Sequence, residues 1–133
     1  MSWVWSFTLY RSWWHIAAEK QFETKVKKFL DEQGCYYIKT HGDRFSRVGT
    51  PDLLINCNGF FLGVELKAPN GKPSELQLYH IEQIKKCGGI GLVLYPSGYD
   101  KFKKLIEFLK HYEPIGKDVV LWKKDGKNNK RTN

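Results

Sequence analysis

The chain has 133 residues, of which 41% are apolar and 15% aromatic. This composition excludes a disordered protein and fits one domain with one core. Its 22 Lys and Arg outnumber 14 Asp and Glu, so the formal net charge is +8. That excess favours a polyanionic partner, most simply nucleic acid, although many basic proteins bind none.

The first sixteen residues, MSWVWSFTLYRSWWHI, contain four tryptophans. They lack the basic n-region and the cleavage site of a signal peptide, and they are too short to span a bilayer. We therefore expect a cytoplasmic protein that is not secreted and does not engage a membrane. Because exposed aromatic arms favour association, residues 1–16 are expected to pack on the domain or on a second subunit. An extension created by the choice of start codon is the alternative.

A first helix is predicted from about His15 to Gln33, with Gly34 ending it. Its apolar stripe consists of Phe22, Val26, Phe29 and Leu30. Glu19 lies on the same stripe, where a carboxylate is unusual. Either Glu19 belongs to a site, or it simply favours the helix dipole near the N-terminus.

Residues 35–40 predict a short strand, and the loop that follows leads to Asp52. This loop carries the basic residues His41, Arg44 and Arg47. A basic loop beside an acidic site suits phosphate contacts, although most basic loops are simply solvated.

Asn58-Gly59 predicts a two-residue type I′ turn, since both central residues of that turn need positive φ. Counting outward from the turn places Asp52 opposite Glu65 as a non-hydrogen-bonded pair. Such pairs have Cα atoms about 4.5 Å apart and side chains on one face, which Lys67 shares. Two facing carboxylates repel, and a bound Mg²⁺ or Mn²⁺, which prefers hard oxygen ligands, would offset the repulsion. Solvated charges at the strand ends are the alternative.

A second helix is predicted from Ser74 to about Cys87, closed by Gly88-Gly89. Ser74-Glu-Leu-Gln77 fits a capping box, which gives Gln77 a structural explanation. Residues 90–96 form a continuous apolar run typical of a strand buried on both faces.

A third helix over about 99–112 and a peripheral strand over 118–122 complete the domain, which spans 1–122. The basic tail 123–133 is expected to be disordered, with Lys123 and Lys124 available for phosphate contact. The predicted order, α-β-β-β-α-β-α, indicates an α/β fold with a mixed central sheet flanked by helices. The cysteines Cys35, Cys57 and Cys87 match no zinc or disulfide pattern, which indicates a reducing compartment.

The motif Gly49-Thr-Pro-Asp52, followed by Glu65-Leu-Lys67, resembles the signature of the PD-(D/E)XK nuclease superfamily. With the run GKPSELQ after it and the helical Glu19 before it, the pattern is similar to the VRR-NUC family. The likeness is to its small stand-alone members from phages and bacteria. It covers about residues 17–96, which form the recognisable core, and it implies the PD-(D/E)XK nuclease-like fold.

The resemblance implies a Mg²⁺- or Mn²⁺-dependent endodeoxyribonuclease that needs no small-molecule cofactor. In this chain, Asp52, Glu65 and the backbone carbonyl of Leu66 would bind the metal. Lys67 would position the attacking water, Glu19 would approach the metal through a water, and Gln77 would line the site. Lys72 joins the basic residues already named as an expected DNA contact.

Small stand-alone relatives are associated with homodimers and with four-way (Holliday) junctions, whereas longer relatives prefer flaps. The expected function is therefore resolution of four-way junctions by a homodimer, in the cytoplasm of a bacterium or of a phage-infected host. Flap, single-strand or general DNA cleavage is the first alternative. A catalytically inactive DNA-binding module of the same fold is the second.

Overall fold

The structure is a computed structural model that describes residues 3–40, 47–114 and 116, with side chains from residue 9 onward. Within these ranges the chain is a mixed α/β domain of three helices and a four-stranded sheet, which confirms the predicted class. The elements are α1 (Trp3–Glu32), β1 (Tyr36–Lys39), β2 (Leu53–Cys57), β3 (Phe60–Leu66), α2 (Glu75–Lys86), β4 (Ile90–Leu94), the 3₁₀ turn η1 (Pro96–Gly98) and α3 (Tyr99–Leu109). The predicted strand over 118–122, the tail and most of the basic loop lie outside the described residues.

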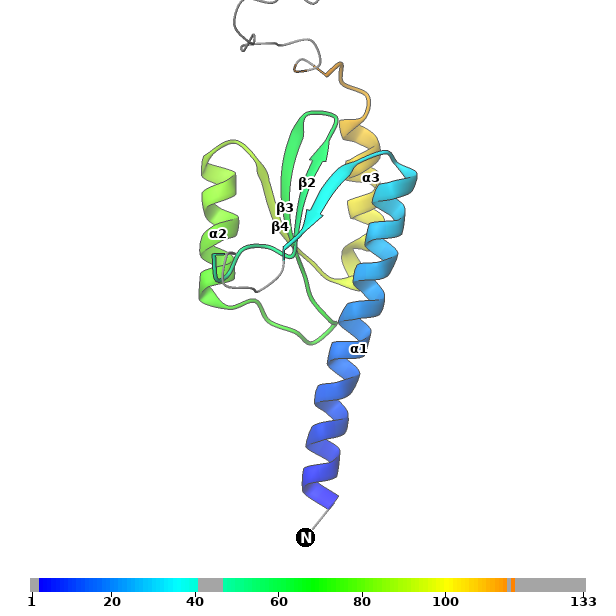
Figure 1. Ribbon diagram of the computed structural model, residues 1–133, viewed down its shortest axis with the longest axis vertical. Coiled ribbons are helices and arrows are strands. Elements are labelled where there is room, and N and C mark those ends of the chain that lie inside the picture. Colours follow the sequence, from blue (N-terminus) through cyan, green and yellow to red (C-terminus); the bar gives the residue numbers. More distant parts are fainter. Residues whose placement is uncertain (1–2, 41–46, 115, 117–133) are drawn as a thin grey trace, which may run out of the picture.

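The sheet has the strand order β1-β2-β3-β4. The first two strand pairs are antiparallel, and β3 and β4 are parallel, with α2 as the crossover between them. Helix α2 covers one face of the sheet, and α1 and α3 cover the other (Figure 1). No described helix combines the length and the apolar character needed to cross a bilayer.

The hairpin between β2 and β3 has the predicted register. Asn58 and Gly59 adopt positive φ values of 54° and 90°, as a type I′ turn requires. The paired residues run from Cys57 opposite Phe60 to Leu53 opposite Val64. One step further along this register places Asp52, the residue immediately before β2, opposite Glu65.

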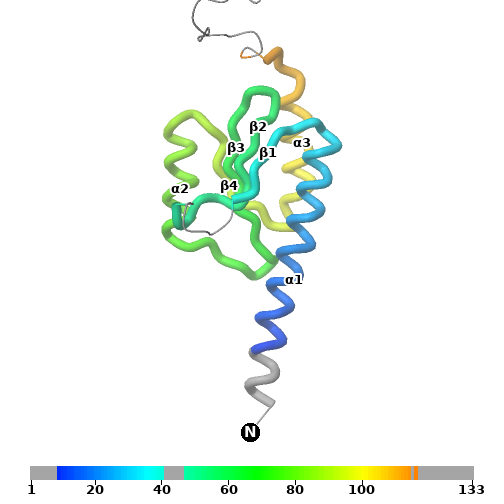
Figure 2. Tube along the Cα trace, in the orientation of Figure 1, coloured from blue at the N-terminus to red at the C-terminus, as the bar shows by residue number. Residues whose placement is uncertain are grey.

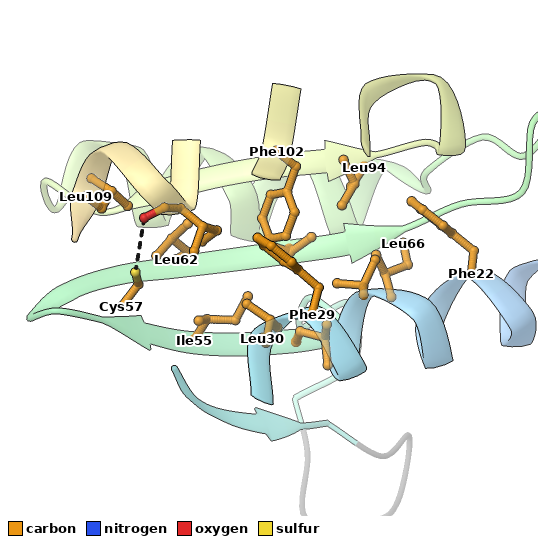
Figure 3. Close-up of a cluster of buried hydrophobic side chains, with 14 residues drawn as sticks. Phe22, Phe29, Leu30, Ile55, Cys57, Leu62, Leu66, Leu94, Phe102 and Leu109 are labelled. Atoms are coloured by element: carbon orange, nitrogen blue, oxygen red, sulfur yellow. Dashed lines mark hydrogen bonds between the residues drawn. The ribbon is translucent and has the colours of Figure 1, made fainter. Parts of the chain in front are cut away.

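The core lies between the sheet and the helices α1 and α3 (Figure 3). Leu30 of α1, Ile55 of β2, Leu62 of β3 and Ile106 of α3 are each at most 1% exposed. Burying one such side chain contributes about 1.5–3 kcal/mol. This apolar layer fixes the position of β3, and Glu65 lies near the carboxyl end of that strand.

On the other face, α2 packs closely on β3 and β4 because two strand residues are glycines. A Cβ atom on Gly63 would lie 2.3 Å from Cδ1 of Ile84, and one on Gly91 would lie 2.6 Å from the carbonyl oxygen of Ile81. Helix α2 leaves the part of this face over β1 and β2 uncovered, since Tyr36 of β1 and Asn56 of β2 are exposed.

Helix α1 begins at Trp3, so the prediction that it starts at about His15 was wrong. Residues 3–33 contain no glycine or proline, and once a helix is nucleated each further residue adds a hydrogen bond at little cost. The N-terminal half of α1 projects away from the sheet (Figures 1 and 2). Leu9, Trp13 and Ile16 are 66–74% exposed, so this part of the helix does not pack on the described domain.

Helix α3 ends at Leu109, three residues before the predicted end at Tyr112. The side-chain amide of Asn58 donates hydrogen bonds to the carbonyl oxygens of Leu109, at 2.8 Å, and of Tyr112. The hairpin turn therefore satisfies carbonyl groups that the helix end leaves unpaired.

Candidate active site

The β2–β3 ladder stops at a proline, and this places the first acidic side chain. Pro51 would be the next residue opposite Leu66, but it has no N–H with which to continue the ladder. The N–H of Leu66 donates instead to Oδ2 of Asp52, at 2.9 Å. The carbonyl oxygen of Pro51 accepts a hydrogen bond from Oγ1 of Thr40, at 2.7 Å, which ties this segment to the end of β1.

Glu65 is the only charged residue that is buried among those the structure describes, with 1% of its surface exposed. Its Oε2 accepts a hydrogen bond from the N–H of Asp52, at 3.2 Å. Its Oε1 accepts one from Nε2 of Gln77, at 2.6 Å, and lies 3.2 Å from Nζ of Lys67. The predicted grouping of Asp52, Glu65, Lys67 and Gln77 is therefore present in the structure.

Backbone hydrogen bonds stabilise both carboxylates. Each accepts a hydrogen bond from a backbone N–H of the opposite strand, which reduces the cost of placing them together. Burial nevertheless raises the pKa of Glu65 to about 7, and the negative charge of Asp52 adds to this shift, while Lys67 opposes it. A carboxyl group whose charge is disfavoured by burial and by a neighbouring acid is typical of functional sites.

Gln77 has two roles in the structure. Its Oε1 accepts a hydrogen bond from the N–H of Ser74, at 2.8 Å, and its own N–H donates to Oγ of Ser74, at 3.2 Å, so the predicted capping box is confirmed. The box uses only the oxygen of the side-chain amide, which leaves Nε2 to donate to Glu65. The start of α2 is thereby tied to the acidic pair.

The oxygen ligands at this site fit a hard divalent cation. Asp52 and Glu65 supply carboxylates. The β2–β3 register, continued two residues beyond Leu53 and Val64, places Leu66 opposite Pro51, which has no N–H to offer the Leu66 carbonyl. Among the described residues, no three Asp, Glu, His or Cys side chains gather as a ready metal-binding group. A cation would therefore be held by two carboxylates, a backbone carbonyl and water, as is common for Mg²⁺.

The structure does not bring Glu19 into this cluster. Phe22 of α1 lies near Leu66 at the carboxyl end of β3 (Figure 3), and Glu19 precedes Phe22 by almost one helical turn. Glu19 is half-buried and, within the described part of the chain, forms no hydrogen bond or ion pair with Asp52, Glu65 or Lys67. Its proposed contact through water stays a prediction.

Two of the predicted DNA-binding residues lie on the segments that flank the site. Arg47 is exposed in the turn that leads to Asp52, and Lys72 is exposed in the loop after β3. His41, Arg44, Lys123 and Lys124 lie outside the described residues.

Two supporting residues were missed by the sequence analysis. The hydroxyl of Tyr95 donates to the carbonyl of Gly71, at 2.9 Å, and holds the loop that carries Lys72. Thr40 supports the segment of Asp52, since its N–H also donates to the Asp52 carbonyl, at 2.9 Å. Both contacts join residues that are distant in sequence, so no local sequence pattern predicts them.

The chain was compared with protein-family models, with curated proteins and with solved structures. None of the three comparisons gives a match.

Proposed function

We propose that the protein is a Mg²⁺- or Mn²⁺-dependent endonuclease of the PD-(D/E)XK type, similar to the VRR-NUC family, that hydrolyses phosphodiester bonds in DNA. The observation that carries the proposal is the environment of Glu65. A buried carboxylate at the end of a strand contacts a lysine and a glutamine and is paired with a second acid. A purely structural role does not explain why a core position should hold a charge that both burial and the neighbouring Asp52 destabilise.

The chain's own residues have separable roles in this chemistry. Leu66 N–H and Asp52 N–H hold the two carboxylates in place, and Gln77 fixes the orientation of Glu65. A bound divalent cation supplies charge neutralisation at the phosphate and makes water a better nucleophile at neutral pH. Lys67, whose side chain is 13% exposed, presents its ammonium beside Glu65, where it can donate to a phosphate oxygen or to the attacking water.

The charge of the whole chain supports a DNA substrate. Acidic residues at a site repel DNA, and a net charge of +8 together with the exposed Arg47 and Lys72 offsets that repulsion. The exposed apolar residues of α1 also offer a surface for a second copy. A homodimer has two sites related by two-fold symmetry, which suits the two-fold symmetric cuts of a four-way junction. Cleavage of flaps or single strands is the second candidate.

Cleavage of labelled DNAs in Mg²⁺, Mn²⁺ or EDTA tests the proposal. The panel contains a four-way junction, a flap, a nicked duplex, a single strand and a linear duplex. Asp52→Ala and Lys67→Ala should each lower cleavage by at least about a hundredfold, since they remove charge stabilisation in the transition state. Asp100→Ala is the matched control, because Asp100 lies on α3 with an 86% exposed side chain. Equal cleavage by the three variants would refute the assignment of Asp52 and Lys67 to the active site. Binding of junctions without cleavage in any divalent ion would favour an inactive module.

A further inference from the structure

A groove of about 560 Å³ lies between α2 and the start of β3, away from the carboxylates. Its helix wall consists of His80, Gln83 and Ile84 of α2 and of Cys87, the residue that caps the helix, which lie on one face by their spacing. Phe61 and the turn Gly88-Gly89 form the opposite side. The volume is in the range of sites for small organic molecules.

The groove presents the aromatic ring of Phe61 opposite the side-chain amide of Gln83. Phe61 is 48% exposed although it lies on a central strand, because α2 does not cover it. The strand registers place Tyr36, Asn56 and Phe61 in one row across β1, β2 and β3. Tyr36 is 69% exposed and Asn56 is exposed, so the row is an open aromatic surface with an amide at its centre. Oδ1 of Asn56 accepts a hydrogen bond from the N–H of Gly59, at 2.9 Å, which leaves its amide nitrogen as a donor. Gln83 adds a second amide from the helix wall.

The groove and the candidate active site lie on one face of the sheet, separated by Ile84 of α2, which packs on Gly63 between them. Phe61 and Glu65 are four residues apart on β3, so their side chains point to the same face of the sheet. The separation along the strand is about 13 Å. A few nucleotides of a single strand span this distance.

The chemistry of the groove selects one class of occupant. Exposed aromatic rings bind nucleobases by stacking, and side-chain amides hydrogen-bond to base edges. Lys86, in the last turn of α2, immediately precedes Cys87 of the groove wall, and its charge suits the phosphates of a bound strand. Lys85 is paired with Glu82, at 2.9 Å. Bases of an intact duplex are stacked on each other and do not offer their faces to such a ring.

We propose that the groove binds an unpaired nucleobase, stacked on Phe61 and hydrogen-bonded by Gln83, a few nucleotides away from the phosphate that the site cleaves. The substrate class is then DNA with unpaired nucleotides beside the cut, such as a flap or a junction with an unpaired segment. This inference rests on the proposed nuclease function and selects among its substrates.

Binding measured without cleavage separates the groove from the chemistry. Fluorescence anisotropy in EDTA compares a fully paired four-way junction, the same junction with unpaired nucleotides at its centre, a flap, a single strand and a linear duplex. We expect the wild-type protein to prefer the DNAs with unpaired nucleotides by about tenfold. Phe61→Leu, which keeps an apolar side chain but removes the ring, should lose about fivefold or more of the affinity for these DNAs, and Phe61→Trp should restore it. Phe108→Leu is the matched control, since Phe108 is a 57% exposed aromatic on α3.

Alkylation of Cys87 gives a second readout at the groove itself. Cys87 is an exposed thiol in the groove wall, and mass spectrometry can follow its reaction with iodoacetamide. An oligonucleotide with unpaired nucleotides should slow this reaction, and a paired duplex should not. The reaction of Cys87 in the presence of the paired duplex serves as the reference, because burial raises the pKa of the Cys35 thiol and slows its alkylation.

The outcomes distinguish the groove from the active site. Suppose that the wild-type protein cuts DNA but that Phe61→Leu neither weakens binding nor changes the protection of Cys87. The proposed base-binding role of the groove is then refuted, and the proposed nuclease function is supported. If Phe61→Leu weakens the binding of unpaired bases but no DNA is cut in any divalent ion, the proposed nuclease function is refuted and the base-binding role of the groove is supported. Equal affinity of the wild-type protein for paired and unpaired DNAs would also overturn the inference.

Discussion

Gln77 donates a hydrogen bond from Nε2 to Oε1 of Glu65 at 2.6 Å, while its other amide atom caps α2 at Ser74. One side chain therefore joins the start of a helix to the buried acid. The two roles can be separated because only one of them uses Ser74. The helix cap is a matter of stability, whereas the contact with Glu65 is a matter of the site.

Ser74→Ala and Gln77→Ala should differ in activity more than in stability. Each variant removes part of the capping box, and loss of such a cap costs about 1 kcal/mol of the free energy of unfolding. Only Gln77→Ala also frees Glu65 to reorient, so its cleavage rate should fall by about tenfold or more, against little change in Ser74→Ala. Urea denaturation and single-turnover cleavage measure the two effects. Equal cleavage rates in the two variants would show that Gln77 serves the helix alone.

Glu65→Gln should make the metal-free protein more stable at pH 8. The pKa of Glu65 is about 7 in the folded protein, against an ordinary value of 4.5. The folded state therefore holds this proton more tightly than the unfolded state, so its contribution to stability is complete below pH 4.5 and is lost as the pH rises to about 7. The loss amounts to up to about 3 kcal/mol. A neutral amide avoids it.

Denaturation of both proteins in EDTA between pH 4.5 and 8 checks this prediction. The difference between the unfolding free energies should grow in favour of Glu65→Gln with rising pH and level off near pH 8. The variant should be inactive in cleavage throughout. A difference that does not depend on pH would mean that Glu65 titrates normally in the folded protein.

Added Mg²⁺ should stabilise the wild-type protein through the acidic pair. A ligand that binds only the folded state stabilises it by about 2.7 kcal/mol at a hundredfold excess over its dissociation constant. Burial and the charge of Asp52 raise the pKa of Glu65, and a bound cation favours its charged form, so the gain should be largest at pH 8. Thermal unfolding with and without Mg²⁺ measures this stabilisation for the wild type, for Asp52→Asn and for the control Asp100→Asn. A shift in the melting temperature that persists in Asp52→Asn would place the cation elsewhere.

The sequence predicted the part of the site that one hairpin determines. Asn58-Gly59 fixes the register, and the register brings Asp52, Glu65 and Lys67 to one face. The hydrogen bond from Leu66 N–H to Asp52 was not predicted, because it follows from the missing N–H of Pro51 at the end of the ladder.

Contacts between distant elements were beyond the sequence patterns. The start of α1 at Trp3 could not be predicted from helix propensity. The aromatic residues before His15 are compatible with a helix but do not favour one strongly. The link from Gln77 to Glu65 needs the packing of α2 on β3, which depends on Gly63. The groove beside Phe61 likewise appears only when α2 leaves part of the sheet uncovered.

The N-terminal half of α1 should hold two copies of the protein together. Leu9, Tyr10, Trp13, Trp14 and Ile16 are 49–74% exposed on a helix that projects from the domain (Figure 2). An aromatic residue buries about 150–250 Å² when covered, so these five side chains supply on the order of 500 Å² per copy. Two copies then approach the lower end of specific interfaces, about 1,200 Å² in total.

Sedimentation of Trp13→Glu tests this interface. A charge at the 74% exposed Trp13 should convert a wild-type dimer to a monomer, because it would be buried without a partner. The same substitution at the exposed Phe108 of α3 should leave the dimer intact. The monomer should still bind DNA but lose paired cuts at a four-way junction, since each cut needs its own site. A wild-type protein that sediments as a monomer, or a Trp13→Glu dimer, would remove α1 as the interface.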